Sequence, residues 1–74
     1  MSPKEMIRKF NEFVANTNAA SSVTELLACE GAESYLSLDE MEYVEMGMYG
    51  VDDLRQLLQE RDAELFVMMM EENK

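Results

Sequence analysis

The chain has 74 residues, and its 16 Asp and Glu against 6 Lys and Arg give a formal net charge of −10 at pH 7. This length allows one domain at most, here 1–74, and an apolar content of 47% suffices for a small core. With no His, no Trp and one Cys, the chain excludes a disulfide framework, His- or Cys-based catalytic triads and an ordinary zinc site. No apolar run approaches the length of a membrane helix and the start lacks a signal-peptide pattern, so we expect a cytoplasmic protein.

The first predicted helix begins at Ser2, which suits an N-cap, followed by Pro3 and then Glu5 to complete a capping box. An apolar stripe at helical spacing predicts its buried face: Met6, Ile7, Phe10, Phe13 and Val14. The helix is expected to fade in the turn-prone cluster 16–18.

Two further capping boxes follow. The first, at Ser22 and Glu25, predicts a short helix that runs through Cys29 and ends at Gly31. The second, at Ser37 and Glu40, opens a helix whose predicted inner stripe is Leu38, Met41, Val44 and Met48. Tyr35 and Leu36 before it suit a hydrophobic staple or a short extra turn, and Gly47 and Gly50 end or bend the helix.

The last helix is predicted to start near Val51 and either to run unbroken to about Glu72 or to restart at Asp62. Its shared apolar face comprises Val51, Leu54, Leu57, Leu58, Leu65, Met68 and Met69. No segment alternates with a period of two, so the sequence predicts an all-α fold, a small compact bundle of four to five short amphipathic helices.

The negative charge is concentrated in the middle of the chain. Residues 1–9 carry +2, residues 10–54 carry −10 with no Lys or Arg, and residues 55–74 carry −2. One interpretation is that the acids keep a small protein soluble. The sharper one is an acidic surface that docks on the basic surface of a nucleic-acid-binding protein, with carboxylates in the place of phosphates. The candidate binding residues are Glu30, Glu33, Asp39, Glu40, Glu42, Tyr43, Glu45, Asp52 and Asp53.

On a helical wheel, Tyr43 and Met46 fall among the acids on the side away from the predicted inner stripe. An aromatic side chain ringed by charge is typical of a protein interface. The alternative is that both side chains pack on a neighbouring helix.

The C-terminal segment 65–70 is apolar around almost the whole helix circumference. We expect it either to insert into the core or to bind a partner groove or a second copy, with Phe66, Val67 and Met70 as the apolar interface. Arg61 lies within the apolar face, where its head either reaches water or pairs with a carboxylate.

Catalysis and cofactor binding are not expected. A chain this short has little room for the cleft that a catalytic carboxylate pair needs, and neither 39–42 nor 52–53 matches a calcium loop. Cys29 lies near the C-terminus of a predicted helix and has no activating base, which favours a small core residue. The only basic cluster, Lys4, Arg8 and Lys9, is too small to favour direct binding of nucleic acid.

We therefore expect an acidic protein-binding module, an inhibitor that occupies a basic nucleic-acid site by charge mimicry. In size, charge and helicity it resembles the anti-CRISPR and anti-restriction inhibitors of phages. The alternative is a structural or regulatory subunit, or an antitoxin-like adaptor, that binds through its apolar C-terminal helix.

Overall fold

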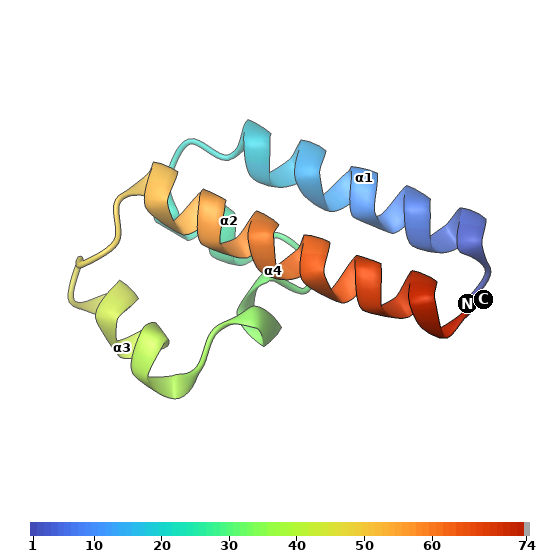
Figure 1. Ribbon diagram of the computed structural model, residues 1–74. Coiled ribbons are helices and arrows are strands. Elements are labelled where there is room, and N and C mark those ends of the chain that lie inside the picture. The colour runs from blue at the N-terminus through green and yellow to red at the C-terminus, as the bar shows by residue number, and fades with distance from the viewer. Residues whose placement is uncertain (74) are drawn as a thin grey trace.

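The computed structural model describes residues 1–73, which form four α-helices, one short 3-10 helix and no strand. The elements are α1 (Pro3–Ala19), α2 (Val23–Ala28), η1 (Ala32–Tyr35), α3 (Leu38–Glu45) and α4 (Val51–Glu72). The two long helices, α1 and α4, lie side by side and antiparallel, so that both termini are at the same end (Figure 1). The predicted small all-α bundle is confirmed.

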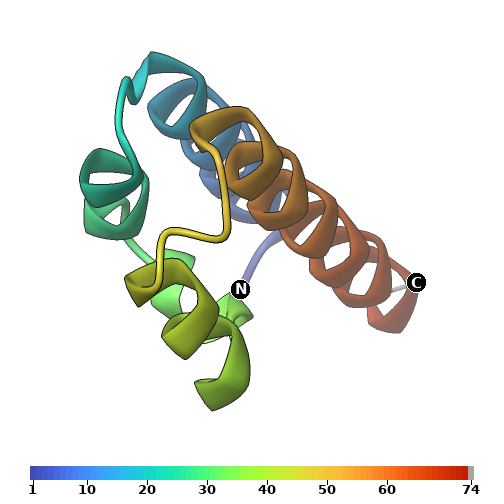
Figure 2. The ribbon, with the colours of Figure 1, turned by 90° about the vertical axis from the view of Figure 1, so that its left-hand side faces the viewer.

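The shorter elements form a second layer on one side of the α1–α4 pair. Figure 2 shows α2 and α3 on that side, with α3 furthest from the two long helices. Together the layers make an elongated molecule of 41 × 24 × 15 Å. None of the helices in the described residues is long and apolar enough to cross a membrane.

The serines predicted as N-caps act as caps. The hydroxyl oxygens of Ser2, Ser22 and Ser37 each accept a hydrogen bond from the backbone N–H three residues on. Only at Ser37 is the box reciprocal, because the Glu40 carboxylate also accepts from the Ser37 N–H at 3.0 Å. In the Ser22 box, the Glu25 carboxylate instead accepts hydrogen bonds from the backbone N–H and the hydroxyl of Ser21, the residue before the cap. These caps explain why α2 and α3 form although both are short.

Helix α1 does not fade at 16–18 but continues through Ala19, so that expectation is wrong. The buried Thr17 hydroxyl donates to the carbonyl oxygen of Phe13 at 2.7 Å and accepts from Gln59 at 2.9 Å. Arg55 of α4 donates to the carbonyl oxygens of Thr17 and Ala20, at 2.9 and 2.7 Å. These tertiary contacts satisfy carbonyl groups that a helix end otherwise leaves without partners.

The core lies where α1, α4 and the second layer meet, and Leu26, Leu54 and Leu58 are its largest fully buried apolar side chains. Its complete set is Phe13, Ala20, Leu26, Ala32, Val44, Leu54 and Leu58. Of the predicted α1 stripe, Met6 and Phe13 are buried, whereas Ile7 is 43% exposed. The predicted apolar stripe is therefore wider than the part of α1 that the neighbouring helices cover.

The predicted inner stripe of α3 is confirmed at Val44 and Met41 and wrong at Leu38 and Met48. Val44 is buried and Met41 half-buried, but Leu38 is 88% and Met48 63% exposed. Only a narrow arc of α3 faces the bundle, and Leu38 lies outside it. Gly47 has a φ of +74°, a left-handed conformation that ends the helix, so Met48 lies beyond it.

Helix α4 is continuous, and the alternative restart at Asp62 is wrong. The short extra turn predicted around Tyr35 is confirmed as η1. Gly31 is left-handed with a φ of +86°, but it caps η1 and does not end α2, which stops at Ala28.

Candidate protein-binding surfaces

The side of α3 that faces away from the bundle mixes apolar and acidic side chains. We call it the α3 outer face, and it comprises Leu38, Asp39, Glu42, Tyr43, Glu45 and Met46, which helical geometry places within an arc of about 160°. Leu38 is 88% exposed, Met46 70% and Tyr43 42%, so the predicted exposure of Tyr43 and Met46 is confirmed. Within residues 1–73, none of the three carboxylates makes an ion pair.

The other predicted binding residues are exposed, but they do not all gather beside α3, because Glu30 lines a hollow together with Lys9 and Glu12 of α1. Glu30 and Glu33 lie on the segment from α2 into η1, and Asp52 and Asp53 lie in the first turn of α4, where negative charge suits the helix dipole. The Asp52 carboxylate accepts a hydrogen bond from Arg55 at 2.6 Å.

Glu40 differs from the other candidates because its carboxylate is already bound. Both Nη atoms of Arg61 donate to it, at 2.7 and 2.8 Å, and Arg61 also donates to the carbonyl oxygen of Tyr35. These hydrogen bonds from Arg61, with the one from the Ser37 N–H, lower the pKa of Glu40 from 4.5 to about 2. Of the two alternatives for Arg61, pairing with a carboxylate is confirmed. Glu40 therefore fastens α3 to α4 and is not a free carboxylate for docking.

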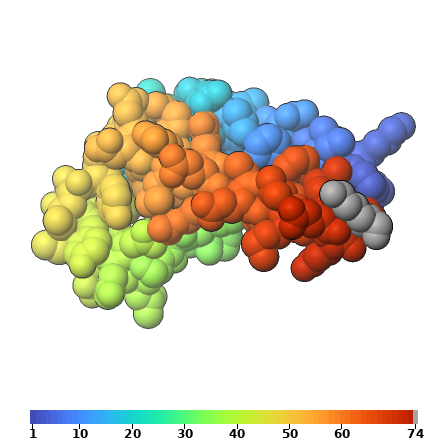
Figure 3. Space-filling view, viewed as in Figure 1, coloured from blue at the N-terminus to red at the C-terminus, as the bar shows by residue number. Residues whose placement is uncertain are grey.

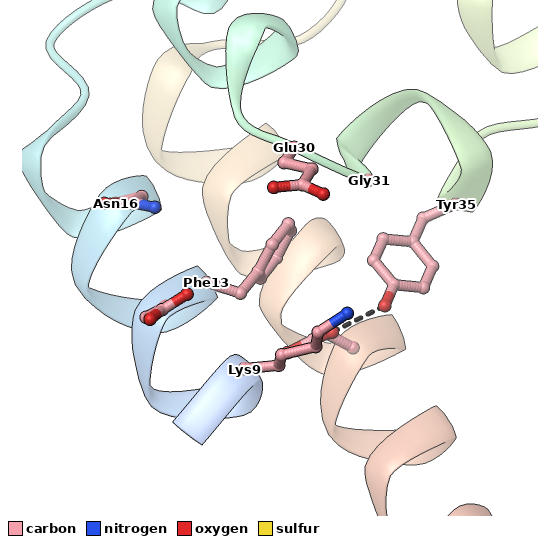
Figure 4. A pocket seen from close by; sticks show the side chains of 8 residues that line it. Lys9, Phe13, Asn16, Glu30, Gly31 and Tyr35 are labelled. Atoms are coloured by element: carbon pink, nitrogen blue, oxygen red, sulfur yellow. Dashed lines mark hydrogen bonds between the residues drawn. The ribbon is translucent and has the colours of Figure 1, made fainter. Parts of the chain in front are cut away.

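A hollow of about 220 Å³ with a mixed polar and apolar lining lies between α1, η1 and α4, and it was not predicted. At its edge the Tyr35 hydroxyl donates to Asp62 at 2.5 Å, while the second carboxylate oxygen of Asp62 is buried without a partner in the described residues (Figure 4). Burial raises the pKa of Asp62 above 3.8, although the bond from Tyr35 opposes this, and burial also raises the pKa of Tyr35. Tyr35 is thus a donor and not a base at neutral pH. The signal in the sequence was an acid at a mid-helix position on the inner side of α4.

The C-terminal apolar segment lies at the opposite end from α3. Phe66 is half-buried and stacks on Phe10 with ring centroids 4.6 Å apart, and Met70 is also half-buried. Val67 is 53% exposed, and the neighbouring Met68 and Leu65 are 58% and 42% exposed. Among the residues predicted for this interface, Val67 is thus openly exposed, and sequence reasoning missed Leu65 and Met68 as surface residues.

Neither the acidic side chains nor Cys29 forms a reactive cluster in the described residues. In the described residues no three His, Cys, Asp or Glu side chains come together as metal ligands. Cys29 is half-buried against the core, and its thiol donates to the carbonyl oxygen of Glu25. Its packing agrees with the prediction of a small core residue.

Comparison of the chain with protein-family models, with curated proteins and with solved structures finds no match.

Proposed function

We propose that the protein binds another protein through the α3 outer face, and that the target is the basic surface of a nucleic-acid-binding protein. The observation that supports this proposal is that α3 makes few contacts with the rest of the bundle and exposes most of its side chains. Val44 is its one buried side chain, Met41 is half-buried, and Glu40 makes its one ion pair within residues 1–73, while the outer side of the helix is exposed. A short helix with several large apolar side chains in water suits a surface that a partner covers.

The charges on this face favour a basic partner. Asp39, Glu42 and Glu45 follow one another at intervals of three residues, which corresponds to an axial rise of about 4.5 Å per carboxylate. The phosphates along one strand of DNA rise by about 3.4 Å each. A row of carboxylates at this scale suits Lys and Arg side chains that otherwise bind phosphates, and Tyr43 and Met46 beside it supply apolar contact area.

The test uses the immobilised full chain to capture proteins from a nuclease-treated lysate of the source cells. We expect it to retain a nucleic-acid-binding protein that rising salt releases and that added duplex DNA or RNA displaces. Displacement by nucleic acid is the decisive observation, because salt alone releases any electrostatic partner.

Two variants with the same change in net charge distinguish binding by the α3 outer face from a general effect of the negative charge of the protein. The triple variant D39N/E42Q/E45Q should lose the captured protein. The control E5Q/E64Q/E71Q removes three exposed charges from the other end of the molecule and should keep it. If both variants bind equally well, or if nucleic acid does not displace the captured protein, the proposal fails.

A second candidate function, a subunit or adaptor that binds through its C-terminal helix, is favoured by the exposure of Leu65, Val67 and Met68. In that case L65E and M68E, and not the α3 variant, would abolish capture of the partner.

A further inference from the structure

The α1–α4 pair is longer than the layer that covers it. The elements α2, η1 and α3 lie against the half remote from the termini, and the C-terminal part of α4 projects beyond them (Figures 1 and 3). Where this cover ends, a mainly apolar hollow of about 270 Å³ opens between α1 and α4. Its lining includes Met6, Phe10, Leu65, Phe66 and Met69, with Lys9 and Asp62 also on its wall.

A single stripe of α4 borders this uncovered region. Arg61, Leu65, Met68 and Glu72 follow at intervals of four, three and four residues and so share one side of the helix. In the covered half, Leu54 and Leu58 occupy the same side and are fully buried. The stripe that forms the core therefore continues into water at Leu65 and Met68.

This stripe is complementary to itself in the antiparallel direction. When two copies of α4 cross midway between residues 66 and 67, Leu65 of each copy faces Met68 of the other, and Arg61 faces Glu72. Arg61 has five N–H groups and uses three hydrogen bonds within its own chain, so it retains donors for a second carboxylate. Lys9, in the wall of the hollow, makes no ion pair within residues 1–73 and adds positive charge beside Asp62.

We propose that a second copy of this chain covers the hollow, by antiparallel packing of the two α4 stripes about a two-fold axis near residues 66 and 67. The contact is isologous, which means that both copies use the same stripe. Each copy covers the part of the other copy's α1–α4 pair that the second layer leaves open. It goes beyond the proposed function and does not depend on it, because the α3 outer face lies at the other end of the molecule.

The first test is sedimentation equilibrium of the full chain over a range of concentrations and of NaCl. We expect the mass of two chains to appear with rising concentration and the dimer to become tighter with added salt, because screening weakens repulsion between two chains of −10 each. Docking of the α3 outer face on a basic partner must weaken with salt, so the two interactions respond in opposite directions. The mass of one chain at every concentration up to about 1 mM, the limit of a meaningful specific dimer, overturns the inference.

The second test places a charge in the stripe. L65E and M68E should each weaken the dimer at least tenfold, because a carboxylate then faces an apolar side chain in the contact. V67E is the matched control, since Val67 is 53% exposed but lies on another side of α4, and its dimer should stay within about twofold of the wild type. Circular dichroism checks that each variant remains helical. Equal weakening by V67E, or none by L65E and M68E, contradicts the proposed stripe.

The third test determines whether the two α4 helices pack antiparallel or parallel, and it does not require a variant that weakens the dimer. In a C29S background, L65C and M68C are treated with a short bis-maleimide, separately and mixed. Antiparallel packing predicts that cross-linking is strongest in the mixture, between position 65 of one chain and 68 of the other. Cross-links that form mainly within each separate variant indicate parallel packing and overturn the assignment.

Discussion

The ion pair between Glu40 and Arg61 links α3 to α4 through two hydrogen bonds, and Glu40→Gln tests it. A pKa lowered from 4.5 to about 2 corresponds to about 3.4 kcal/mol at most, at 1.36 kcal/mol per pKa unit, and the hydrogen bond from the Ser37 N–H contributes part of it. The side chains of Glu40 and Arg61 remain 19% and 34% exposed, so solvent screening reduces this. We expect E40Q to lower the free energy of unfolding by about 1–2 kcal/mol at pH 7, measured by urea denaturation.

The effect of E40Q must also depend on pH. A carboxyl group whose pKa is lowered by folding contributes its full stability above its unfolded pKa, here 4.5, and loses it as the pH falls through about 2. The difference between wild type and E40Q should therefore shrink between pH 4.5 and 3. The control is E42Q on the outer side of the same helix, which should change stability by less than about 0.5 kcal/mol. A cost of E40Q that is absent at pH 7, equal to that of E42Q or constant with pH would refute the reasoning.

Two further changes probe the core and the hollow. Leu58→Ala should cost about 2–5 kcal/mol in urea denaturation because Leu58 is fully buried, whereas Leu38→Ala, at 88% exposure, should cost less than about 0.5 kcal/mol. Tyr35→Phe removes the hydrogen bond to Asp62 and should cost about 1–3 kcal/mol at pH 7. Because losing this donor raises the pKa of Asp62 further, the cost should be smaller at pH 4 than at pH 7, and an equal cost at both would contradict the assignment.

The helix starts were predictable from the sequence because N-capping is a local interaction. Ser2, Ser22 and Ser37 each lie within three residues of the N–H group that they bind. The end of α1 was not predictable in the same way. The turn-prone cluster at 16–18 remains helical because Arg55 and Gln59, about forty residues later in the chain, bind its polar groups.

For the binding surfaces, the sequence predicted which residues are acidic but not which are free. Arg61 has sixteen carboxylates in the chain as possible partners, and the choice of Glu40 depends on how α3 lies against α4. Similarly, the apolar pattern of α3 and α4 marks side chains that suit burial, but it does not specify how far the covering layer extends. Leu38, Leu65 and Met68 are exposed because that layer ends before it reaches them.

The acids of the middle segment are partly neutralised by bases from the two ends of the chain. Residues 10–54 contain no Lys or Arg, so any ion pair of their acids must reach a base in another segment. The three ion pairs of the described residues each neutralise an acid of that segment: Glu12, Glu40 and Asp52, through Arg8, Arg61 and Arg55.

The acids that remain unpaired on the α3 outer face lie at the end of the molecule remote from Leu65 and Met68. The long axis is 41 Å, several times the screening length of about 8 Å at physiological salt. Two chains joined near residues 66 and 67 would therefore hold their α3 outer faces far enough apart for most of the repulsion between those two faces to be screened. Such a dimer would present two copies of the α3 outer face, so a target with two basic sites at a matching distance would be bound with avidity.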